Sequence, residues 1–401
     1  MRISSREIQL VGLNSMLEQQ DKLSKTQQQV ASGNRVLTPS DDPVATTQIL
    51  KLQQAVDTTQ RYQDNAGAAR DRLGLEESVL QGVTNSLQRV RELVVKANDG
   101  VHTDETRSYI AAEIRQRLDE LLGLANTKDG NGDYLFAGGK GATVPFACSS
   151  GSYQYYGDQS ERFIQIGSGR QVADGDSGAD VFGLIRTGNG TFVTDASGTN
   201  TGTGVIDAGT VNGGFVPSPP NGYMITIGAG STYTVTDSNA NVVTGPTGYV
   251  SGDPIEFNGA RVTITGTPSA GDTFSVSSSG YQNVFETLDK LATALETPAS
   301  SPVGKAQLEN ALTQGLSNID QSMTNVLVVR SSVGTRLNAI DSQQTVNDDE
   351  RLQTKDVLSS LQDLDYADAV TRLNLQMAGL DAAQKAYMKV QGLSMFNYLS
   401  M

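Results

Sequence analysis

The amino-acid sequence predicts an α+β fold, in which long coiled-coil-like helices from both chain ends flank an inserted antiparallel β domain. Helix-forming Gln, Leu, Arg, Ala and Glu dominate residues 1 to about 137 and again residues 282–401. From about 140 to 281, Gly, Thr, Ser and Val dominate, and residues 185–287 contain no leucine. Because glycine and β-branched residues favour turns and strands, this middle zone is expected to be a β-rich insertion.

The helical zones place apolar residues at alternating spacings of three and four, the pattern of a helix that packs along other helices. For the internal stripes, the helices of a compact bundle are an alternative explanation. The stripes near the chain ends contain fewer apolar residues, since Gln20 and Gln27 interrupt the first one. They bury little surface in one chain, so we expect them to pack against other copies. The expected assembly interface consists of Leu13, Met16, Leu23, Val30, Leu373, Met377, Leu380, Ala383, Tyr387 and Val390.

These zones predict three domains. Residues 1–39 with 366–401 are expected to form a terminal helical assembly domain. Residues 40–181 with 282–365 are expected to form a helical bundle with short β elements, and residues 182–281 an antiparallel β domain.

The segment between residues 38 and 43 predicts a helix break. Pro39 disfavours the helical conformation in the residue before it, while Pro43 is tolerated in the first turn of the next helix. Ser40, Asp41 or Asp42 can cap that helix, because each has a side-chain oxygen that accepts a backbone N–H.

Alternating apolar residues predict strands within the middle zone. The clearest are residues 232–236, 261–265 and 273–277. Asn258-Gly259 predicts a two-residue hairpin turn, since a type I′ turn needs positive φ at both positions. Residues 134–137 are expected to form a short apolar strand after a turn.

The composition excludes several classes of function. Thirty Lys and Arg against 44 Asp and Glu give a net charge of −14, so we expect neither nucleic acid nor an anionic membrane as partner. A single cysteine excludes an internal disulfide and a Cys-based zinc site. A single histidine removes most His-centred catalysis and metal sites. No apolar run is long enough to span a bilayer. Residues 1–7 lack the apolar core of a cleavable signal peptide, so the ordinary secretory route is not expected.

The segments that resemble catalytic or metal-binding motifs lack residues that those motifs require. Asp129 begins a sequence like a calcium loop, but Tyr134 replaces its glycine and Lys140 its bidentate glutamate. We therefore expect no enzyme activity, no cofactor and no metal. His102 is expected to be solvated near a helix start, and Cys148 to pack as a small apolar residue.

Several short segments, in this order, resemble one bacterial family. They are MRIS at 1–4, SGNRV at 32–36, PSDDP at 39–43, YLFAG at 134–138, YGD at 156–158, VGTRLN at 333–338, AAQKAY at 382–387 and SMFNYL at 394–399. The chain resembles the flagellar hook–filament junction proteins, also called hook-associated protein 3, of the flagellin-like superfamily. Flagellin is the nearest alternative, but it has an Ala-rich stretch after its paired aspartates and a different C-terminal tail.

The resemblance implies a structural component of the flagellum that joins hook to filament, with a flagellin-type filament subunit as the alternative. It implies unfolded export through the type III channel, then assembly as a homo-oligomeric ring through the terminal helices. The implied partners are the first hook-associated protein on the hook side, flagellin on the filament side and a cytoplasmic export chaperone, seated between Leu373 and Val390. The implied location is extracellular, at the hook–filament junction, after a transient cytoplasmic stage.

Overall fold

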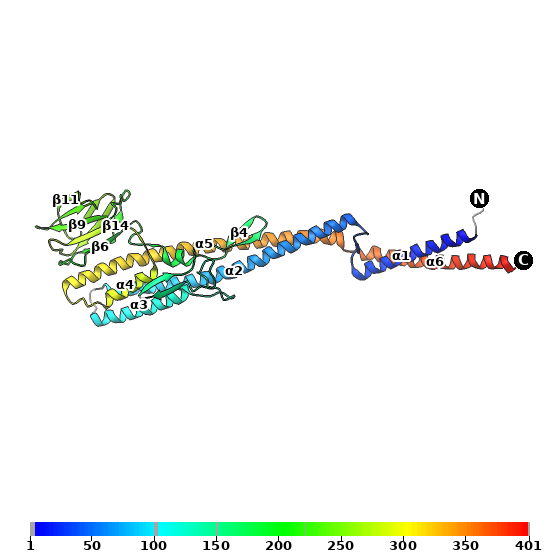
Figure 1. Cartoon of the computed structure of the whole chain (residues 1–401), viewed down its shortest axis with the longest axis horizontal. Coiled ribbons are helices and arrows are strands. Elements are labelled where there is room, and N and C mark those ends of the chain that lie inside the picture. Colours follow the sequence, from blue (N-terminus) through cyan, green and yellow to red (C-terminus); the bar gives the residue numbers. More distant parts are fainter. Residues whose placement is uncertain (1–4, 100–102, 150, 221, 400–401) are drawn as a thin grey trace. The chain divides into compact units, whose positions relative to one another are not determined.

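The computed structural model describes residues 5–99, 103–149, 151–220 and 222–399. It confirms the α+β class, with long helices from both ends and an inserted antiparallel β domain (Figure 1). The chain forms two compact units, which are described separately below. We call residues Met1–Asp64 with Gln343–Met401 the terminal unit, and residues Asn65–Ser342 the central unit. The division into three domains stays a prediction.

Six α-helices carry most of the chain within the described ranges. They are α1 (Ser5–Ser32), α2 (Pro43–Ala97), α3 (Asp104–Ala125), α4 (Val284–Glu296), α5 (Pro302–Gln362) and α6 (Tyr366–Leu399). In the central unit α2 and α5 run antiparallel, and three ion pairs join them. These pairs are Arg91–Asp320 at 2.7 Å, Arg330–Glu77 at 2.6 Å and Arg70–Asp341 at 3.4 Å.

The α2 and α5 helices meet through heptad seams in the central unit. Every seventh residue of α5 from Leu312 to Ile340 is buried, and so is every seventh residue of α2 from Leu73 to Val94. Helices α3 and α4 pack together and add buried leucines and Phe285 to the same core. This burial pattern agrees with the coiled-coil spacing expected from the sequence.

Short strand pairs line the helices of the central unit. These are β1 (Phe146–Ser149) with β2 (Ser152–Tyr155), β3 (Phe163–Gly167) with β4 (Arg170–Ala173), and β5 (Ile185–Arg186) with β15 (Tyr281–Gln282). A π-helical turn, η1 (Ala179–Gly183), precedes β5. Phe136, Phe146, Phe182 and Phe285 fill the space between these loops and the helices with ring contacts of 4.9 to 5.9 Å.

The strands from β6 to β14 form a separate body, which we call the β domain. Its larger sheet has the order β11–β10–β9–β14–β6, and its smaller sheet the order β12–β13–β7, with β8 also paired to β13. The strands are β6 (Phe192–Ala196), β7 (Val205–Ile206), β8 (Thr210–Val211), β9 (Tyr223–Gly228), β10 (Thr232–Thr236), β11 (Val242–Gly248), β12 (Pro254–Phe257), β13 (Ala260–Thr265) and β14 (Thr273–Ser278).

The predicted hairpin is confirmed in this domain. Asn258 and Gly259 have φ of 43° and 79°, as a type I′ turn requires, and Phe257 pairs with Ala260 across it. The expected strands at 232–236, 261–265 and 273–277 correspond to β10, β13 and β14.

Two local predictions were wrong. Residues 134–137 form turns with one isolated bridge from Tyr134, because the Phe136 carbonyl accepts hydrogen bonds from the Gly178 N–H and the Tyr155 hydroxyl instead of a neighbouring strand. Cys148 is exposed rather than packed, since it lies in a two-stranded sheet beyond the last buried residue of β1, Phe146.

One core position of α2 carries a carboxylate. Glu76 occupies the heptad row of Ala69, Val83 and Val90 and is fully buried. One of its oxygens accepts the Asp176 N–H at 3.2 Å, and the other has no hydrogen-bond partner among the described residues. Burial raises the pKa of Glu76 to about 8; the Asp176 carboxylate adds to this rise and the Arg336 guanidinium opposes it.

This carboxylate predicts a pH-dependent stability. Because the folded pKa of Glu76, about 8, exceeds its ordinary value of 4.5, the folded state holds the proton more tightly between these pH values. The free energy of unfolding should therefore fall as pH rises through that window, by on the order of 1 kcal/mol per pH unit from this group. Glu76→Gln should remove this loss.

Urea unfolding at pH 5, 6.5 and 8 measures the effect. The stability gap between Glu76→Gln and wild type should grow as pH rises, because glutamine mimics only the protonated acid. Glu309→Gln, on an exposed position of α5, is the matched control and should show no such trend. A gap that stays constant with pH would contradict the assignment.

Candidate assembly surface of the terminal helices

In the terminal unit, α1 and α6 pack as an antiparallel pair (Figure 1). A Cβ atom placed on Gly12 would lie 3.3 Å from the Tyr387 ring, and one placed on Gly33 would lie 3.0 Å from the Tyr366 hydroxyl. Thus the start of α1 lies beside the later part of α6, and the end of α1 beside the start of α6. The missing Cβ atoms at these glycines let the helices approach closely.

The face between α1 and α6 contains few large apolar side chains. Small or amide residues such as Gly12, Gln19, Gln376 and Gly379 alternate with the apolar ones along it. Among the described side chains of the terminal unit, the buried apolar residues are Ala45, Ile49, Leu364 and Ala369. Neither of the two hydrophobic cores formed by the described residues includes a member of this unit. The described side chains of the terminal unit therefore form no core of their own.

The residues expected to form the assembly interface divide between two faces. The half-buried members, on the paired faces of α1 and α6, are Met16, Leu23, Val30, Leu373, Leu380, Ala383 and Tyr387. Leu13 and Met377 are instead 42% and 50% exposed. The side chain of Val390 lies outside the described residues. The role of these residues in assembly stays a prediction.

Large apolar side chains are exposed on both helices, and among them Leu13 and Met377 belong to the predicted interface. We call these side chains together the exposed apolar face; they include Leu10, Leu13 and Leu17 on α1, and Val370, Leu375, Met377 and Met388 on α6. The spacing of three and four in its α1 part is a helical stripe that the sequence already contains. Large apolar side chains are also exposed in the same unit at Val44, Leu50, Val346, Leu352 and Val357. So many exposed apolar side chains in one unit indicate an interaction site.

The break between α1 and α2 and the break between α5 and α6 are joined by backbone hydrogen bonds. Gly33, at φ +73°, ends α1, and its carbonyl accepts the Leu364 N–H at 2.9 Å. The Arg35 N–H donates to the Gln362 carbonyl at 2.8 Å, and its guanidinium donates to the Leu361 carbonyl at 2.9 Å. The entry into α2 and the exit from α5 are thereby held together.

Asp42, among the three candidates, caps α2. Its carboxylate accepts the Ala45 N–H at 2.9 Å, and Pro43 is the first helical residue, as its fixed φ favours. Asp41 has a different role, because it accepts the Thr38 N–H at 3.1 Å and pairs with Lys25 at 2.7 Å. The hydrogen bond from Lys25, followed by that from Thr38, lowers the pKa of Asp41.

No group of three or more His, Cys, Asp or Glu residues in the described part of the chain is arranged to hold a metal ion. No helix in that same part is both long and apolar enough to cross a membrane. His102 lies outside the described residues. The terminal unit is the candidate functional site, because its described side chains form no core and several large apolar ones are exposed.

Comparisons with known proteins relate this architecture to flagellar proteins. Residues 3–140 match the bacterial flagellin N-terminal helical region. The chain is 28% identical over 397 residues to flagellar hook-associated protein 3 of Escherichia coli (strain K12), covering 99% of each. It is 34% identical to the solved flagellar hook-associated protein 3 of Legionella pneumophila, with a TM-score of 0.75, covering 78% of this chain and 98% of that one. Phase 1 flagellin of Salmonella naestved is 28% identical over 130 residues, which are 32% of this chain and 26% of flagellin.

Proposed function

Because this chain belongs to the family of flagellar hook-associated protein 3, we propose that it joins the hook of a bacterial flagellum to the filament. It acts there as a structural component and assembles as a ring through α1 and α6. It leaves the cell unfolded through the type III channel and folds fully only on assembly. The observation that carries this proposal is that the described side chains of the terminal unit form no core of their own.

The exposed apolar face supports assembly between copies. Its side chains lie on two helices whose own pairing leaves them in water, including Leu375 at 68% exposure. Hiding such surface against neighbouring copies contributes about 25 cal/mol per Å². A contact between unlike faces of successive copies closes into a ring when the rotation between copies allows it.

The charge distribution favours the same arrangement. Residues 1–38 carry a net charge of +2 and residues 365–401 carry none, so residues 39–364 hold all the negative excess of the chain. Nearly neutral helices can pack side by side with little repulsion between copies. The acidic remainder is suited to facing water.

The proposed partners follow from the position at the junction. The ring contacts the first hook-associated protein on the hook side and flagellin on the filament side. Before export, a cytoplasmic chaperone covers the apolar residues of α6 from Leu373 to Val390. Covering them prevents aggregation of a surface that is completed only in the assembled flagellum.

A flagellin-type filament subunit is the second candidate. The match to flagellin supports it, but that match covers about a third of the chain, whereas the match to hook-associated protein 3 covers nearly all of it. The two roles differ in solution. A filament subunit forms long filaments from purified protein alone, and a junction protein does not.

Deletion of the protein tests the junction role directly. Electron microscopy should show bare hooks, and flagellin should appear in the culture medium, because filament subunits no longer have a surface on which to assemble. Expression of the full chain should restore filaments. Unchanged filaments after deletion would rule the role out.

Charged substitutions should separate helix pairing from assembly. Leu375→Glu changes the exposed apolar face and leaves the residues between α1 and α6 unchanged, so it should abolish filament attachment. Leu380→Glu lies on the half-buried face, so it should also weaken that pairing. Circular dichroism should show the central unit folded in both variants.

Asn374→Glu adds the same charge at an exposed polar position of α6 and is the matched control. Swimming motility and electron microscopy measure attachment. Normal swimming with Leu375→Glu would show that the exposed apolar face takes no part in assembly.

A further inference from the structure

The central unit contains two separate hydrophobic cores. One, between the helices and their short strand pairs, includes Ile185 and Phe285; the other, inside the β domain, includes Phe192 and Val276. The chain passes between them through the neighbouring strands β5 and β15, where Arg186 pairs with Tyr281. The Arg186 guanidinium also lies 4.4 Å from the centre of the Tyr281 ring. The β domain is therefore a body with its own core on a narrow, two-stranded connection.

A row of amide side chains lies along α5 on the side that faces this body. The row steps by three or four positions, which places its members on one face of the helix. Its members are Gln307, Asn310, Gln314, Asn318, Gln321 and Asn325. We call it the amide row. Its apolar neighbours on α5, by contrast, belong to the helical core.

The amide row binds the backbone of the β domain. The Asn318 side-chain oxygen accepts the Gly188 N–H, just before β6, at 2.8 Å. Asn310 accepts the Ile206 N–H at 2.9 Å and donates to the Gly204 carbonyl at 3.0 Å. Gln307 donates to the Gly198 carbonyl at 3.1 Å. Each amide can both donate and accept, so the row can satisfy backbone groups that the β domain leaves unpaired at this surface.

The last member of the row makes a different contact. Asn325 donates to the carbonyls of Asp180 and Val181 at 2.8 and 3.0 Å, and these residues belong to η1, beside the helical core. Asn325 thus has the same chemistry on the same helix face but does not touch the β domain. It provides an internal control for the others.

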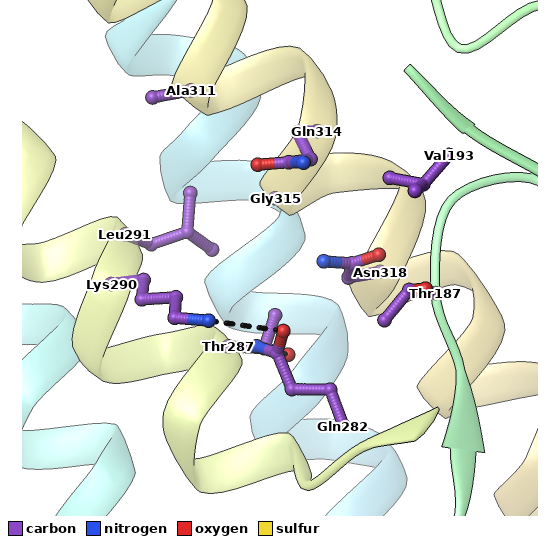
Figure 2. Close-up of a pocket in the computed structure, with 10 residues that line it drawn as sticks. All are labelled: Thr187, Val193, Gln282, Thr287, Lys290, Leu291, Ala311, Gln314, Gly315 and Asn318. Atoms are coloured by element: carbon purple, nitrogen blue, oxygen red, sulfur yellow. Dashed lines mark hydrogen bonds between the residues drawn. The ribbon is translucent and has the colours of Figure 1, made fainter. Parts of the chain in front are cut away.

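The junction between the two bodies is not closely packed. A cavity of about 220 Å³ lies there, bordered by Gln314 and Asn318 of the amide row, by Lys290 and Leu291 of α4, and by Thr187 beside β5 (Figure 2). On its α4 side the Lys290 ammonium donates to the Gln282 side-chain oxygen at 3.2 Å. Polar groups line much of this space, so water can enter it. Apolar packing does not seal this part of the junction.

Such a junction is specific in orientation but weak. A hydrogen bond between an amide and the backbone contributes little net stability, because water replaces it when it breaks. An interface that is small and polar leaves two bodies free to move relative to one another. The few hydrogen bonds of the amide row are therefore the main restraint on the β domain besides its connecting strands.

We propose that Asn310 and Asn318 of the amide row form a latch that holds the β domain on α5. When the latch opens, the β domain turns about β5 and β15, and both cores stay folded. The device belongs to the central unit and is independent of the role proposed for the terminal unit. It lets the β domain change direction without any change in the helices.

Distance measurements between spin labels test the latch in the full-length chain. The parent carries Cys148→Ser with Val242→Cys and Val328→Cys, since both valines are exposed, on β11 and α5 respectively. The parent should show one narrow distance distribution. Asn310→Ala with Asn318→Ala should broaden it into several components, while Asn325→Ala should leave it narrow.

Hydrogen exchange of the peptides containing Gly188 and Ile206 gives a second measurement. Their amides lose an acceptor in the double variant, so exchange there should be about tenfold faster. The strands of the β domain should keep their protection. A narrow distance distribution in the double variant would overturn the proposal, because other contacts would then hold the domain. Loss of protection throughout the β domain would also overturn it, because the amides would then be part of its fold.

Discussion

The described side chains of α1 and α6 bury little apolar surface between these two long helices, and the assembly that we propose depends on this deficit. Small and amide residues occupy the paired face, while Leu10, Leu17 and Leu375 remain in water. Ordering each residue costs conformational entropy of about 1–2 kcal/mol, and burial must offset it. In the central unit the heptad leucines and the phenylalanine cluster provide that burial. In the terminal unit, we propose that neighbouring copies provide it.

The hydrogen bonds between the two helix breaks show how such a unit keeps its register. The Leu364 and Arg35 amides donate across the breaks to the Gly33 and Gln362 carbonyls, so the ends of α1 and α5 are aligned by the backbone. These hydrogen bonds determine how the helices are aligned, whereas burial of apolar side chains determines how stable the fold is. The same division recurs in the central unit, where the amide row orients the β domain and two apolar cores stabilise the bodies that it joins. Polar contacts therefore govern geometry in both units.

Much of the fold could be predicted from the sequence, because heptads, turns and alternating strands are local patterns. The hairpin at Asn258-Gly259 is an example, since its backbone conformation depends on two adjacent residues. The environments of Phe136 and Cys148 could not be predicted, because they depend on loops that pack from elsewhere in the chain. Leu10 and Leu17 of the exposed apolar face were missed, although their helical spacing with the predicted Leu13 is visible. Helical spacing alone does not show which of two stripes faces the partner helix.

Hydrogen exchange of the dilute, monomeric protein tests the central claim most directly. If the terminal unit lacks sufficient burial, the amides of α1 and α6 should exchange almost as fast as an unfolded chain, while those of α5 between Leu312 and Ile340 stay protected. Slow exchange in α1 and α6, matching that of the heptad core of α5, would contradict the account. It would mean that the terminal helices are stable without any neighbour.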